Sequence, residues 1–162
     1  MPISTSGVIG VALGDVGPTA IFAPGTVINL DDGGQAMYVQ AASDISQFAA
    51  VSVLSNETAV PLTTTNAANS KRVGFAQTSI ASAQYGWVQL GGVVKVNLLT
   101  ACAPSVPLFT TATAGCLDDA TVSGNGVGLV VGVTNAGSTA SGTTALTCIA
   151  AFPHISGGAG AI

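Results

Sequence analysis

Charged side chains are scarce in this sequence of 162 residues, and cations are the scarcest of them. Charged residues make up 6% of the chain, with three Lys or Arg against seven Asp or Glu and a formal net charge of −4. An average soluble protein carries about 25%. A protein that binds nucleic acid needs a basic surface to neutralise phosphates, and three cations cannot form one. The composition therefore excludes nucleic acid as a partner.

Long apolar runs are also missing, although the mean hydropathy is +0.63. The longest runs, residues 7–14 and 126–133, span eight residues each, far fewer than the ~18–20 that cross a bilayer as a helix. No cation precedes Lys71, so the positive segment of an export signal is absent. We expect neither a membrane nor export. An apolar, charge-poor chain of this kind often covers its surface with other subunits.

Residues that move protons are few as well. The single histidine, His154, would have to be the base of any Ser-His-acid triad, but the Gly-x-Ser-x-Gly elbow is absent. The paired carboxylates Asp31–Asp32 and Asp118–Asp119 are interpreted as turn residues, because they lack the spacing of a calcium loop. We therefore predict no catalytic residue, no cofactor and no metal ligand, and we do not expect an enzyme.

The three cysteines, Cys102, Cys116 and Cys148, are an odd number at wide spacings, and no Cys-x-x-Cys pair occurs. This pattern favours buried thiols that act as small apolar residues in a reducing compartment over a zinc site. Whether any two of them form a disulfide is left open.

The local pattern predicts an all-β fold, because apolar residues recur with a period of two rather than 3.6. One segment, residues 43–50, opens with an N-cap and has helical spacing, so at most one short helix is expected. Turn signals rich in glycine separate the predicted strands. These strands cover residues 8–13, 20–23, 26–30, 36–41, 73–80, 85–90, 93–98, 106–111, 127–134 and 143–152.

A glycine pair, Gly91–Gly92, joins two alternating runs and predicts a tight hairpin turn, since glycine readily adopts positive φ. Near the C-terminus, alternation predicts one apolar strand face that includes Val131 and Val133, and another that includes Cys148 and Phe152.

Two large aromatic residues, Tyr85 and Trp87, share one face of their predicted strand, while Val88 and Leu90 share the other. Core packing is the default interpretation for such a pair. If Val88 and Leu90 already face the core, however, another subunit is a natural cover for the aromatic face. Tyr85 and Trp87 are therefore the candidate subunit interface.

A series of short segments, most of them led by glycine, runs through the chain: Val73–Gln77, Tyr85–Gly92, Pro107–Thr111, Ala114–Asp118, Gly128–Val133 and Ala151–Pro153. This series resembles small head proteins of tailed bacteriophages, namely the capsid decoration (cement) proteins and related minor head proteins. The resemblance is best over residues 73–155 and looser over the first third.

The resemblance implies a compact β-barrel or sandwich of the β-tulip type that is often trimeric and clamps neighbouring shell subunits. The expected partners are the major capsid protein and further copies of the chain, with a trimer favoured. The expected location is the outer surface of the capsid in the virion, after synthesis in the cytoplasm of a bacterial host. Such a fastener needs few charges to desolvate and can use backbone groups at sheet edges.

The chain divides into residues 1–35, residues 36–155 as a β-rich decoration domain, and residues 156–162 as a mobile tail. Residues 1–35 are either the first strands of the barrel or an extended arm on a neighbour. Two other functions remain open. One is a head or tail fibre protein that binds a host receptor or glycan. The other is a soluble β-barrel that binds a small apolar ligand beside Gly128 and Gly132.

Overall fold

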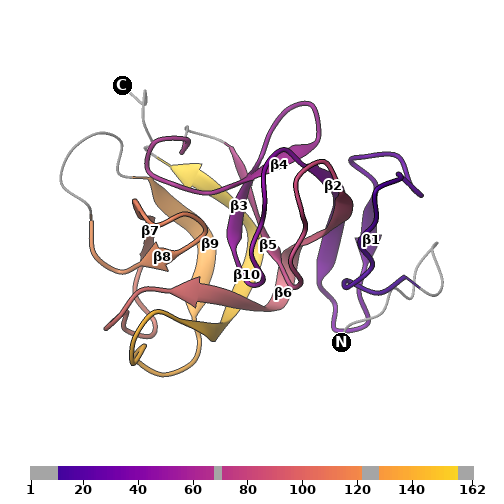
Figure 1. The fold of residues 1–162 in the computed structure, drawn as a ribbon. Helices are drawn as coiled ribbons and strands as arrows, with labels where there is room; N and C mark the ends of the chain where they lie inside the picture. The colour runs from indigo at the N-terminus through magenta and orange to yellow at the C-terminus, as the bar shows by residue number, and fades with distance from the viewer. Residues whose placement is uncertain (1–10, 68–70, 122–127, 157–162) are drawn as a thin grey trace.

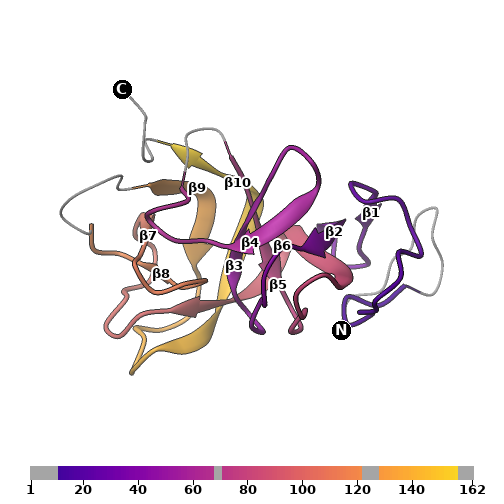
Figure 2. The ribbon, with the colours of Figure 1, turned by 45° about the horizontal axis from the view of Figure 1, so that its top comes forward.

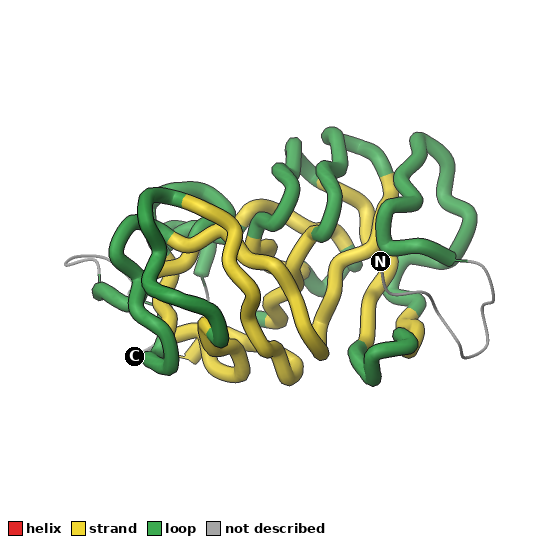
Figure 3. Tube along the Cα trace, turned by 90° about the horizontal axis from the view of Figure 1, so that it is seen from below, coloured by secondary structure: helices red, strands yellow, loops and turns green. Residues whose placement is uncertain are grey.

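The computed structural model describes residues 11–67, 71–121 and 128–156. These residues form strands, turns and loops without any helix (Figure 1 and Figure 3), which confirms the all-β prediction. The strands are β1 (Val27–Asn29), β2 (Gln35–Ala41), β3 (Ala50–Val53), β4 (Thr58–Pro61), β5 (Arg72–Ala76), β6 (Tyr85–Leu98), β7 (Leu108–Thr110), β8 (Leu117–Asp118), β9 (Leu129–Asn135) and β10 (Thr144–Ser156).

Five of the strands close a ring, which we call the first barrel. Its order is β2, β4, β3, β5, β6 and back to β2, and every pair is antiparallel except β2 with β4. Each strand contributes buried apolar side chains to one common cluster, as expected for the inside of a closed sheet. The cluster includes Met37, Val39, Val51, Val53, Ala59, Ala76, Val88 and Leu90.

A second ring, which we call the second barrel, uses β6 again. Its order is β6, β10, β9, β7, β8 and back to β6, and only the pair β6 with β8 is parallel. All five strands again contribute to one buried cluster, which includes Val94, Val96, Leu98, Leu108, Leu117, Val130, Val133, Cys148, Ala150 and Ile155.

The two barrels lie side by side and are joined through β6 and β5 (Figure 2). The first half of β6 pairs with β2, and the second half pairs with β10. β5 separates the two cores: Val73 and Phe75 belong to the second core, and Ala76 belongs to the first. Burial on both faces explains why β5 lacks a clean alternation of polar and apolar residues.

The predicted hairpin at Gly91–Gly92 is wrong, because β6 continues through both glycines. Gly91 is the partner of Gln35 in β2 and of Ala151 in β10, so the strand changes neighbours here. Gly92 has a φ of 92°, which bends the strand at little steric cost. The buried side-chain amide of Gln89 donates hydrogen bonds to the carbonyl oxygens of Gly91 (2.9 Å) and Val93 (3.2 Å), which holds the bend.

The predicted inward positions of Val131 and Phe152 are also wrong, since both side chains are exposed. The pairing of β9 with β10 shifts register between Ala150 and His154. Gly132 in β9 has a φ of 86°, and Phe152 in β10 has a φ of 50°. An irregularity of this kind reverses the alternation of the residues beyond it.

Local predictions are also wrong for residues 11–13, 20–23 and 43–50. Residues 43–50 form no helix: Ile45 makes a bridge with Ile80, and Phe48 has a φ of 62°. Residues 11–13 and 20–23 lie outside the strands, although Val11 and Leu13 are buried. Residues 8–10 of the first predicted strand, and residues 157–162 of the predicted tail, lie outside the described residues. The other predicted strands overlap β1, β2, β5, β6, β7, β9 and β10, but residues 77–80 of the strand predicted over 73–80 lie beyond the end of β5.

Candidate functional sites

The candidate subunit interface, Tyr85 and Trp87, lies on the outer face of the first barrel. Trp87 is fully buried and Tyr85 is half-buried. The Trp87 ring centroid lies 4.9 Å from that of Tyr38 and 5.4 Å from that of Phe22. These distances are typical of packed aromatic pairs. The indole N–H of Trp87 has no hydrogen-bond partner among the described residues.

The chain itself supplies the cover over this aromatic face. Val11, Leu13, Ile28 and Leu30 belong to the same buried cluster as Trp87, and β1 pairs with β2. In the described part of residues 1–35, the segment therefore packs on its own chain and includes the first strand. Trp87 is a core residue, and the cover that we expected from another subunit comes from this segment.

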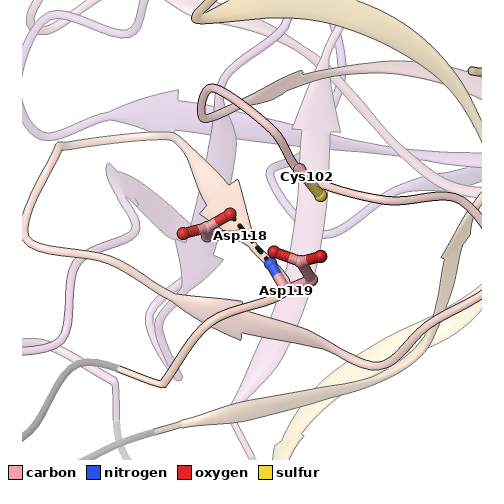
Figure 4. Close-up of side chains that lie close together, drawn as sticks. All are labelled: Cys102, Asp118 and Asp119. Atoms are coloured by element: carbon pink, nitrogen blue, oxygen red, sulfur yellow. Dashed lines mark hydrogen bonds between the residues drawn. The ribbon is translucent and has the colours of Figure 1, made fainter. Parts of the chain in front are cut away.

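The structure brings Cys102 next to the paired carboxylates Asp118 and Asp119, with one ligand atom from each residue within 4.8 Å of the others (Figure 4). The Asp119 carboxylate accepts a hydrogen bond from the Ala103 N–H at 2.9 Å, and the Asp118 carboxylate accepts one from the Asp119 N–H at 2.9 Å. The prediction that Asp118 lies in a turn is wrong, because this residue ends β8. The contact with Cys102 was not predicted, because it joins segments that are distant in the sequence.

The protonation of the cluster is set by burial and by the neighbouring charges. Burial, followed by the charges of Asp119 and Asp118, raises the pKa of the Cys102 thiol to about 11. Burial is also the main cause of a raised pKa for the Asp118 carboxyl. At such a pKa the free thiol stays protonated at neutral pH. We interpret the cluster as a structural clasp in which the carboxylates hold the loops at Ala103 and Asp119.

All three cysteines are free and buried. Burial raises the pKa of Cys116, and it raises that of Cys148 to about 12, with a smaller contribution from Cys102. The predicted buried thiols are therefore confirmed for the chain as described.

We predict that the native protein resists thiol reagents at neutral pH. Ellman's reagent should label the three thiols at least about a thousandfold more slowly than in denaturant, because only opened molecules expose them. Rapid labelling of Cys102 in the native state would contradict the burial of this thiol.

The raised pKa values of Cys102 and Cys148 also predict a pH dependence of stability. Folded molecules keep thiol protons that the unfolded chain releases from its ordinary pKa of 9.0 upward. The free energy of unfolding should therefore fall as the pH rises above about 9.

An exposed apolar surface, which we call the β10 stripe, follows the outer face of the second barrel. It consists of Val93 (55% exposed), Val131 (37%), Ile149 (56%) and Phe152 (57%). Val93 and Ile149 are direct cross-strand partners of β6 and β10, and such partners lie on the same face. Several large apolar side chains exposed together are typical of a contact surface.

The β10 stripe was not predicted from the sequence, although two of its four residues show a local signal. Val93 alternates with the buried Val94 and Val96 and shares its face with Lys95, so an apolar residue stood on a predicted polar face. Ile149 alternates with buried residues in the same way. Val131 and Phe152 could not have been assigned, because their exposure depends on the irregular pairing of β9 with β10.

A polar groove lies at one end of the first barrel. The turn residues 53–57 form one wall, and Lys71 and Arg72 at the start of β5 line the groove with them, enclosing about 690 Å³. His154 is exposed within β10 and is the cross-strand partner of Arg72.

The glycine-lined space proposed for a small apolar ligand is filled. A Cβ added at Gly128 would lie 3.1 Å from Thr110 and 3.2 Å from Ile155. One added at Gly132 would lie 2.7 Å from the carbonyl oxygen of Ala151. These glycines therefore permit close packing against neighbouring side chains and backbone in the described part of the chain.

Comparison with known proteins identifies no relative: no family model matches the chain, and no curated protein matches it significantly. None of the described residues lies in a helix that is long and apolar enough to cross a membrane.

Proposed function

We propose that this chain is a structural protein of the virion that binds the outer surface of a phage head and reinforces contacts between capsid subunits. The observation that carries the proposal is the β10 stripe, an apolar surface on a chain with very few charges. The resemblance to decoration proteins over residues 73–155 supports the same role. The proposed partners are the major capsid protein and further copies of this chain, with a trimer favoured.

The apolar character of the β10 stripe is suited to a permanent contact with another protein. Burying apolar surface contributes about 25 cal/mol per Å², and a standard contact removes roughly 800 Å² per partner from water. Thr134 of β9 and Thr147 of β10 are the polar neighbours of Ile149 across and along the sheet. These two uncharged neighbours keep the cost of desolvation low, whereas Lys95, the cross-strand partner of Thr147, places a charge beside the pair.

Pairing of partner strands with free sheet edges should contribute less to binding than the sequence led us to expect. Among the described strands, only β1 has a single neighbour, because the two rings pair both edges of the others. We therefore propose that side chains on the faces of the barrels, rather than free sheet edges, make most of the contact with the shell.

The copy ratio of this chain to the major shell protein in purified virions tests the proposal. A fixed ratio that matches the shell symmetry is expected, together with a lower rupture temperature for heads that lack the protein. A handful of copies per particle would instead indicate a fibre that binds a host receptor or glycan. Absence from particles, or equal rupture temperatures, would count against a role in reinforcement.

We predict that the double variant Val93→Thr, Ile149→Thr binds heads about thirtyfold more weakly. Losing apolar contact area at two central positions should cost about 2 kcal/mol of binding free energy. The unfolding temperature should change little, because both side chains are more than half exposed. Sedimentation of the variant with stripped heads measures the loss.

A matched control is Ile21→Thr, which alters another exposed isoleucine (66%) outside the stripe. The control should bind like the unmodified protein. Equal weakening by both substitutions would show that general hydrophobicity, and not the β10 stripe, determines binding.

A further inference from the structure

The basic side chains of this protein are concentrated at one place in the fold. The whole chain has three Lys or Arg and one His. Lys71 and Arg72 are adjacent at the start of β5, and the strand register places His154 directly opposite Arg72. Both Arg72 and His154 are exposed, so they lie on the same face of the sheet. We call these three residues the basic corner.

The cations of the basic corner keep unused hydrogen-bonding capacity in the part of the chain that the structure describes. Within the described residues, neither Lys71 nor Arg72 forms an ion pair. The Lys71 ammonium donates to the carbonyl oxygen of Asn66 at 3.4 Å, and one guanidinium nitrogen of Arg72 contacts the sulfur of Met37 at 3.4 Å. A guanidinium has five N–H donors, so most of those of Arg72 are available to a partner.

The groove beside the basic corner adds neutral hydrogen-bonding groups. Its other wall is the turn between β3 and β4, which includes Ser55, Asn56 and Glu57. The side-chain oxygen of Asn56 accepts bonds from the N–H and hydroxyl of Thr58, which leaves its NH₂ group as a donor. The Glu57 side chain lies against Gly25, where a Cβ would be 3.2 Å from its carboxyl carbon.

We propose that this groove binds an acidic segment of a partner protein, with a Glu or Asp carboxylate held by Arg72 and Lys71. A planar guanidinium matches a carboxylate with two parallel hydrogen bonds. The donors of Ser55 and Asn56 suit the backbone of an extended peptide, and the apolar wall at Val53 and Leu54 suits its side chains. Glu57 in the same groove limits the negative charge that the groove accepts, so separate carboxylates of a peptide are favoured over closely spaced phosphates.

This inference deepens the proposed function by naming the chemistry of the partner segment. It rests on that function only for the identity of the partner. The two surfaces meet at His154, which is the cross-strand partner of both Arg72 and Val131. Lys71 and Arg72 of the groove and Val93 and Ile149 of the stripe are different side chains, so each pair can be altered by itself.

A titration followed by two-dimensional ¹H–¹⁵N NMR tests the proposal on the full chain. The probes are a blocked tetraglutamate peptide, the matching tetraglutamine peptide and inorganic phosphate, all at equal ionic strength. The tetraglutamate peptide should shift the amide signals of residues 55–57 and 71–72, and it should bind at least about tenfold more tightly than tetraglutamine.

The variants Lys71→Gln and Arg72→Gln should each weaken tetraglutamate binding by about tenfold, with a larger loss for Arg72→Gln. Lys95→Gln is the matched control, because it removes the remaining cation, which lies 5.7 Å from the ring centroid of Phe48. The control should bind like the unmodified protein, and circular dichroism checks that each variant folds.

Three results would overturn the proposal: equal binding of the two peptides, an equal loss with Lys95→Gln, or phosphate binding at least as tight as that of tetraglutamate. The comparison of peptides uses the unmodified protein, so it does not depend on any variant folding. Peptide binding by a protein that is absent from virions would refute the proposed function and retain the groove. If the protein is found in virions but does not bind the peptide, the proposed function is retained and the proposed peptide groove is refuted.

Discussion

Replacing Trp87 with alanine should lower the free energy of unfolding by about 3–5 kcal/mol. The side chain is fully buried against Phe22 and Tyr38, and its removal leaves a cavity that the barrel wall cannot refill. Domains of this kind are stable by only about 5–15 kcal/mol, so much of the stability would be lost. Urea denaturation followed by circular dichroism measures the effect, since the variant lacks the chain's single tryptophan.

Trp87→Phe is the matched control for this substitution. Phenylalanine keeps most of the ring packing and removes the indole N–H, which has no partner among the described residues. Removing a buried polar group that is unsatisfied offsets part of the lost contact area, so we expect a cost of roughly 1–2 kcal/mol. If Trp87→Ala were as stable as the unmodified protein but failed to assemble, Trp87 would be an interface residue after all.

The second large effect is expected for Gly34→Ala. A methyl group at residue 34, just before β2, would overlap the carbonyl oxygen of Gly91 in β6 and would crowd the Asp32 carboxylate. The Asp32 side chain can move aside, but the Gly91 carbonyl is backbone and cannot. The strands would have to separate at the bend, and we expect a loss of about 2–4 kcal/mol. Denaturation midpoints measure the loss, and hydrogen exchange of the β2–β6 amides shows where it occurs.

Gly17→Ala is a suitable control, because a Cβ at that position meets no atom within 4 Å and the backbone φ is not positive. It should change stability by less than about 0.5 kcal/mol. If Gly34→Ala behaved like this control, β2 and β6 would not approach each other at Gly91, and the predicted hairpin would be favoured again.

The sequence alone determined the class of fold and much of the strand content. Alternation over residues 36–41 and 93–98 is local information, because successive side chains of a strand point to opposite faces. The buried cysteines followed from composition in the same way. For function, the sequence supplied the scarcity of charge and the dibasic pair Lys71–Arg72, but it gave no indication of what lies around them.

Some local sequence patterns are compatible with two different structures, and at these positions only the tertiary structure decided between them. A glycine with positive φ serves a hairpin turn and a bend in a continuous strand equally well, and only the partners of Gly91 in β2 and β10 distinguish them. The cover over Trp87, the exposure of Phe152 and the meeting of Arg72 with His154 likewise depend on pairings between distant segments. Register between strands is set by the packing of whole faces, so it cannot be obtained from a local window of sequence.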